Sequence, residues 1–126
     1  MKGGDIMNAN GTQLAVIGIA IFADYITGVV KACYQHNYKS CVMREGLYHK
    51  AAELFAVALM YFLEIGLPTI GVTINFPFVS SVTVYIVIME ISSIIENIGE
   101  INPELVGPLG KVFDKIKDVS KKGDDK

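Results

Sequence analysis

The sequence has little net charge and no excess of basic residues. Its 11 lysines and arginines stand against 13 aspartates and glutamates, which gives a formal net charge of −2 at pH 7. A nucleic-acid-binding domain usually carries a basic patch or stripe, so this balance argues against nucleic acid as a partner. The 126 residues are enough for one domain.

Residue patterns of catalytic and metal sites are also missing. The glycine pairs fit no phosphate-binding loop, and His36 and His49 have no serine or cysteine partner with an orienting acid. The two cysteines, Cys33 and Cys41, lie near both histidines, but their spacing matches no zinc pattern. We therefore expect no enzyme activity, no cofactor and no metal, and we expect both thiols to be free and reduced.

Long apolar runs dominate what is present. Hydrophobic residues make up 52% of the chain, and three apolar segments cover about residues 12–32, 51–74 and 78–98. About 20 residues of helix span roughly 30 Å, the thickness of a bilayer core. The sequence thus predicts an all-α integral membrane protein with three transmembrane helices. A soluble three-helix bundle would need a polar stripe along each helix, and these segments are too uniformly apolar for that.

The segments between and beyond the spans are polar or broken by proline. We expect a flexible N-terminus to residue 11, a loop at 33–50, and a bend at Pro68 near the end of the second span. Asn102 and Pro103 read as a helix N-cap followed by proline at the first helical position. Apolar residues then recur at helical spacing, which predicts a short amphipathic helix within 103–120, able to lie on the membrane or pack on another copy, and a disordered tail at 121–126.

Lysine and arginine set the expected orientation. Four of them bracket the first loop and are assigned to the membrane surface: Lys31, Lys39, Arg44 and Lys50. Six lysines follow the third span, whereas the turn at 75–77 has none. The positive-inside rule then places the N-terminus outside and the first loop and the C-terminus in the cytoplasm.

Each predicted span carries one acid near its middle, and no basic residue is expected at the same depth. A carboxylate there costs roughly 2.5–3.5 kcal/mol on insertion scales, so it needs a compensating environment. Small and polar residues share a helix face with two of these acids, at spacings of three and four residues. The candidate helix-interface or pore-lining residues are Asp24, Thr27, Gly28, Glu64, Glu90, Ser93 and Asn97. They either hold a helix bundle together or line a wet path, and both interpretations stay open.

These residues resemble a known family, the phage lysis holins and toxin-secretion holins. The similar positions cover about residues 16 to 116: Asp24-x-x-Thr27-Gly28-x-x-Lys31-Ala32, Ser40, Gly46-x-x-x-Lys50, Glu64, Glu90-x-x-Ser93-Ile94-x-Glu96-Asn97, Pro103 and Leu105. Two positions depart from the pattern, since Met43 stands where glycine is usual and Glu64 where aspartate is usual.

The resemblance implies a small protein of the bacterial cytoplasmic membrane. Such a protein would oligomerise in the lipid bilayer and open lesions that release a cell-wall hydrolase (an endolysin) or a large toxin. The alternatives are a small ion-channel or transporter subunit and a membrane adaptor without a pore. Met7 is a candidate second translation start, because the family that the chain resembles includes holins that are made in a long and a short form.

Overall fold

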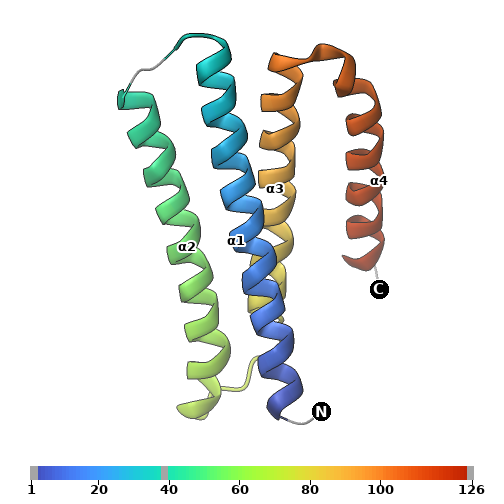
Figure 1. The fold of residues 1–126 in the computed structure, drawn as a ribbon. Coiled ribbons are helices and arrows are strands. Elements are labelled where there is room, and N and C mark those ends of the chain that lie inside the picture. The colour runs from blue at the N-terminus through green and yellow to red at the C-terminus, as the bar shows by residue number, and fades with distance from the viewer. Residues whose placement is uncertain (1–2, 38–39, 125–126) are drawn as a thin grey trace.

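The computed structural model describes residues 3–37 and 40–124, with side chains described for 11–37 and 43–122. Three long helices, α1 (Gly3–Tyr34), α2 (Ser40–Thr69) and α3 (Phe78–Ile101), run side by side (Figure 1). A single 3₁₀ turn, η1 (Pro103–Leu105), then leads into α4 (Val106–Asp124), which runs back along α3. The described residues form no strand, and the all-α prediction is confirmed.

Three helices are long and apolar enough to cross a membrane, as predicted. The candidate spans are Gly11–Tyr34, Met43–Thr69 and Phe78–Ile101. Large apolar side chains cover their outer surfaces: Ile19 and Phe22 on α1, and Phe55 and Phe62 on α2, are each more than 60% exposed. A surface of this kind suits lipid and not water.

Helix boundaries differ from the sequence-based expectation at four places. α1 begins at Gly3, so residues 3–11 are helical. α2 begins at Ser40, which makes the expected loop at 33–50 much shorter, and it ends at Thr69 instead of continuing to residue 74. α4 reaches Asp124, so the first part of the expected disordered tail at 121–126 is helical. At three of these places polar residues form helix beyond the apolar span. α2 instead ends early, because Pro68 lies in its last turn and Gly71 follows in a left-handed conformation.

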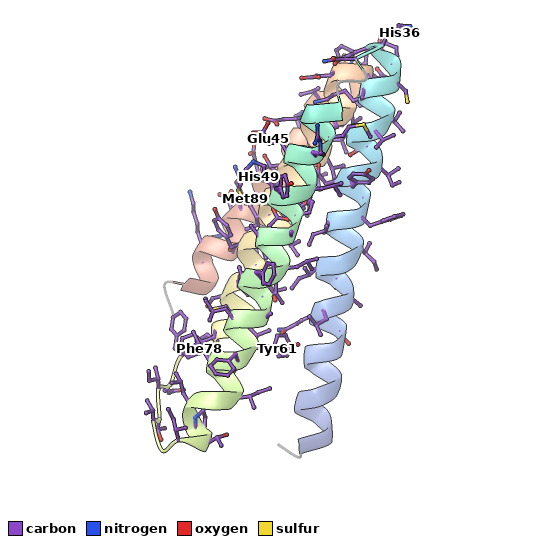
Figure 2. The ribbon with its side chains drawn as sticks, turned by 90° about the vertical axis from the view of Figure 1, so that its left-hand side faces the viewer. His36, Glu45, His49, Tyr61, Phe78 and Met89 are labelled. Atoms are coloured by element: carbon purple, nitrogen blue, oxygen red, sulfur yellow. The ribbon has the colours of Figure 1, made fainter. Side chains whose placement is uncertain are left out.

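The helix ends have identifiable causes. His36 adopts a left-handed conformation (φ 54°), and the Asn37 N–H donates to Ala32 O, which ends α1. Gly71 also adopts a left-handed conformation (φ 83°) just after α2. It lies three residues beyond Pro68, which is in the last turn of that helix. Figure 2 shows His36 and Phe78 at opposite ends of the bundle. The capping prediction at Asn102 holds, because its side-chain oxygen accepts from the Glu104 N–H at 3.3 Å and Pro103 follows as the first residue of η1.

α3 is the central helix, since α1, α2 and α4 each pack against it. Its buried residues lie at spacings of four, three, four and seven: Val79, Thr83, Ile86, Glu90 and Asn97. This spacing gives a nearly straight contact stripe, as in left-handed helix bundles. Four of the nine buried residues in the described part of the chain are polar or charged, and three of those four lie on α3. The interior is therefore unusually polar for a bundle with an apolar exterior.

Candidate functional site

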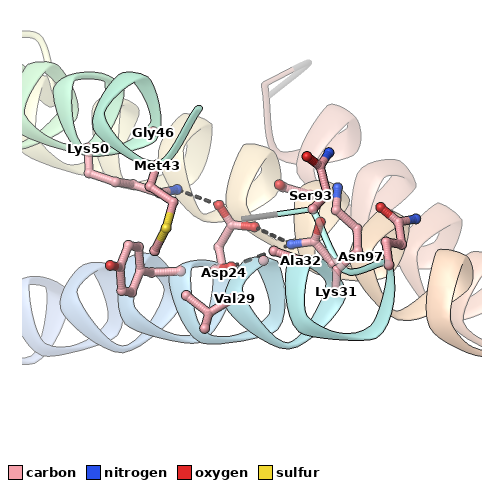
Figure 3. A pocket seen from close by; sticks show the side chains of 13 residues that line it. Asp24, Val29, Lys31, Ala32, Met43, Gly46, Lys50, Ser93 and Asn97 are labelled. Carbon is pink, nitrogen blue, oxygen red and sulfur yellow. Dashed lines mark hydrogen bonds and ion pairs between the residues drawn. The ribbon is translucent and has the colours of Figure 1, made fainter. Parts of the chain in front are cut away.

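The most polar part of the interior is organised by one lysine. Lys50 Nζ lies 2.5 Å from Asp24 Oδ2, pairs with Glu90 Oε2, and lies 3.8 Å from Glu53 Oε2. The side chains of Lys50, Asp24 and Glu90 are 16%, 10% and 2% exposed. We call these four residues the Lys50 cluster; it joins α1, α2 and α3 through a single ammonium group. Figure 3 shows the contact between Lys50 and Asp24.

The cluster forms because its members lie at the same depth. Lys50 is ten residues from the first residue of α2, Asp24 is ten from the last residue of α1, and Glu90 is eleven from the last residue of α3. At about 1.5 Å per residue, each lies roughly 15 Å from the end of the bundle that carries the α1–α2 loop. The long lysine side chain lets its charged head cross from α2 to both neighbours.

This arrangement corrects two expectations. Lys50 was assigned to the membrane surface, and no basic residue was expected at the depth of the acids; the structure places Lys50 between Asp24 and Glu90 inside the bundle. The physical reason is the early start of α2. Ten helical residues precede Lys50, so a residue expected at the end of a loop lies well within a helix. Glu53, which the sequence analysis did not single out, joins the same cluster one turn later.

An amide on α3 extends the polar contacts by two turns. Asn97 Nδ2 donates to Asp24 Oδ1 at 3.1 Å and to Thr27 Oγ1 at 3.0 Å, and the Thr27 hydroxyl donates to Asp24 O at 3.0 Å. Gly28 lies opposite, where a Cβ would be 3.7 Å from Asn97 Nδ2. That distance is an ordinary van der Waals contact, so a methyl group would fit at position 28, but a larger side chain would meet the Asn97 amide.

Polar contacts also join α1 and α3 near both ends. Close to the α1–α2 loop, Lys31 Nζ lies 3.5 Å from Glu100 Oε2, to which Gln35 Nε2 also donates at 3.0 Å. Toward the other end, Gln13 Nε2 donates to Ser80 Oγ at 3.1 Å. Between the Lys50 cluster and this distal bond lies an apolar layer of three residues, Ile17, Val57 and Ile86, exposed by 1%, 4% and 2%. The interior therefore alternates between polar and apolar layers along its length.

The remaining candidate residues lie apart from the cluster or outside the described structure. Glu64 is half-buried on α2, about 21 Å further along the helix than Lys50 at ~1.5 Å per residue, so it does not join the other two acids. Arg44 is exposed near the start of α2, where His49 and Glu45 also form an exposed pair at 3.9 Å (Figure 2). Lys39 lies outside the described residues, and Met7 lies within α1 without a described side chain.

A cavity of about 310 Å³ opens between α1, the beginning of α2 and α3 (Figure 3). Its inner end is formed by Asp24, Lys50, Ser93 and Asn97, and its outer end includes Gln35. Ser93, a candidate from the sequence, thus shares this space with the other polar residues. Among the side chains that the structure describes, no group of three or more histidines, cysteines or acids is placed to hold a metal ion.

The apolar exterior, the three span-length helices and the ion cluster inside them define a multi-pass integral membrane protein. The chain belongs to the bacteriophage holin family, because the model of that family matches residues 5–118. This match confirms the resemblance seen in the sequence. No curated protein and no solved structure matches the chain. The family is one of non-enzymatic membrane proteins, and membership implies membrane association and oligomerisation.

Proposed function

We propose that this protein oligomerises in the bacterial cytoplasmic membrane and opens lesions that release a cell-wall hydrolase or a large toxin. The observation that carries the proposal is the Lys50 cluster: three helices with apolar outer surfaces keep charged groups at membrane depth. Charged residues inside membrane spans are costly and commonly mark a path for water or ions. When copies associate and helices repack, the polar faces of α1 and α3 would form the wall of the lesion.

The proposal assigns no catalysis to the chain itself. Cleavage of the cell wall belongs to the released hydrolase, which needs no direct contact with this protein. The role of the chain is to accumulate in the membrane and then to form openings wide enough for a folded protein.

Inducible expression in a bacterium tests this function. Release of a folded cytosolic enzyme into the medium is the expected result, following a lag during which cells stay intact. An ion-channel subunit would collapse ion gradients and retain the enzyme, and a membrane adaptor would do neither. Retention of the enzyme at expression levels that stop growth would therefore refute the lesion proposal.

We propose the orientation that the charge asymmetry favours, with the N-terminus outside and the C-terminus in the cytoplasm. The segment between α2 and α3 then faces outward. An impermeant thiol reagent applied to intact cells should modify Asn75→Cys and spare the native Cys33, which is exposed beside the α1–α2 loop. Rapid modification of Cys33 with protection at position 75 would reverse the orientation.

We also propose that translation can begin at Met7, giving a shorter product that lacks Lys2. Moving that lysine across the membrane works against the potential by ~2.3 kcal/mol per charge per 100 mV, so the longer form would insert its N-terminus more slowly. Mass spectrometry of the product of the native gene should show both forms. A single Met1 product, with unchanged lysis timing in Met7→Leu, would rule the second start out.

A further inference from the structure

The cavity beside the Lys50 cluster has the position and the chemistry of a solvent path. It is about 310 Å³ in volume, and a water molecule takes about 30 Å³ in the liquid, so several waters fit. The half-buried Lys31 lies in the last turn of α1, and Gln35, exposed at the outer end of the cavity, directly follows that helix. Asp24 and Lys50 close its inner end, roughly 15 Å deeper along the helices.

The charges at the inner end favour water over a lipid chain as the occupant. One ammonium group faces three carboxyl groups, so Lys50 cannot neutralise all of them. Taking such groups out of water costs several kcal/mol per ion unless further polar partners are present. Water entering from the loop end would supply those partners, and the amide of Asn97 and the hydroxyl of Ser93 add polar groups to a wall that also contains Val29 and Met43.

The path does not continue through the bundle. Ile17 lies two helical turns from Asp24 on α1, and Val57 lies two turns from Lys50 on α2, both on the side away from the α1–α2 loop. Ile86 lies about one turn from Glu90 on α3, in the same direction. Ile21, Tyr61 and Val82 pack around them. An apolar constriction of this kind excludes water and blocks ions.

We propose that the cavity is a water-filled crevice in each single copy of the chain. It admits water and small hydrated solutes from the loop side as far as the Lys50 cluster, and the apolar layer of Ile17, Val57 and Ile86 closes it. The crevice exists before any lesion forms and does not depend on one. Each copy therefore already contains water from the loop side to the Lys50 cluster when it joins an assembly.

Cysteine accessibility tests the crevice. Cys33 and Cys41 are replaced by serine, and Ser93→Cys is introduced, a nearly isosteric change inside the cavity. Ile26→Cys is the matched control, because Ile26 lies eight residues from the end of α1, as Ser93 does from the end of α3, but is 42% exposed on the outer surface. A small cationic, impermeant thiol reagent is applied to sealed vesicles of both orientations, at expression levels below the onset of lysis. In the parent chain, reaction of Cys33 identifies the side that carries the loop.

The crevice predicts that Ser93→Cys reacts from the loop side faster than Ile26→Cys by about tenfold or more, because the thiolate that reacts forms readily only in water. It also predicts no reaction of Ser93→Cys from the opposite side, which separates the crevice from a lesion open to both sides. Equal, slow reaction of both cysteines, or equal reaction of Ser93→Cys from both sides, would overturn the proposal. Release of a cytosolic enzyme is a separate measurement, so either proposal can fail while the other stands.

Discussion

Removing the positive charge of Lys50 should destabilise the bundle more than any other single charge change among the described ion pairs. Lys50→Met keeps most of the side-chain volume but leaves Asp24 and Glu90 buried without their cation. Breaking a buried ion pair by deleting one partner costs roughly 3–5 kcal/mol. The matched control is Lys31→Met, whose partner Glu100 is 51% exposed, and an ion pair of that kind is worth about 0–1 kcal/mol.

The assay is loss of helix circular dichroism during titration of mixed micelles with a denaturing detergent. We expect Lys50→Met to unfold at clearly lower denaturant than Lys31→Met, with a difference in free energy of unfolding of about 3 kcal/mol. Combining Lys50→Met with Asp24→Asn and Glu90→Leu should restore much of the loss, because the two most buried carboxyl groups of the cluster are then removed and only Glu53, whose side chain is 26% exposed, keeps its charge. Equal stability of the two single variants would refute the assignment of Lys50 to the interior, as would failure of the triple variant to recover any stability.

Two glycines give further predictions about close helix contacts. Gly28→Ala should be tolerated, since its Cβ would lie 3.7 Å from Asn97 Nδ2, whereas Gly28→Leu should push Asn97 away and lower the denaturant midpoint; equal midpoints would contradict the contact. Gly99→Ala should cost about 1–3 kcal/mol, because its Cβ would lie 2.6 Å from Val106 Cγ2 at the turn into α4. Adding Val106→Ala should recover most of that loss. The rate of protease cleavage at this turn would report both changes. A double variant cleaved as fast as Gly99→Ala alone would contradict the clash.

Much of the architecture follows from the sequence, because hydropathy and proline placement are local signals. The three spans, the Asn102 cap and the amphipathic fourth helix are all visible in short windows of residues. The face shared by Asp24, Thr27 and Gly28 was also visible, since it needs only helical periodicity. The structure shows that this face packs against α3 of the same chain.

The partner of the acids could not be predicted in the same way. Whether Lys50 reaches Asp24 depends on where α2 begins and on how three helices align in depth, and both are long-range properties. Hydropathy placed the start of the second span at Ala51 because Arg44, Glu45 and His49 precede it, although these exposed residues sit on the same continuous helix. A useful signal was present: Lys50 and Glu53 are one turn apart and directly precede an apolar run.

The most direct measurement compares the lysis timing of two conservative variants on α3. Glu90→Gln removes a charge from the Lys50 cluster, and Glu96→Gln removes one from an exposed position on the same helix. At equal protein levels in the membrane, release of a cytosolic enzyme should be lost or strongly delayed in Glu90→Gln and unchanged in Glu96→Gln. Release on the normal schedule from Glu90→Gln would contradict the proposal that the buried charges take part in opening the membrane.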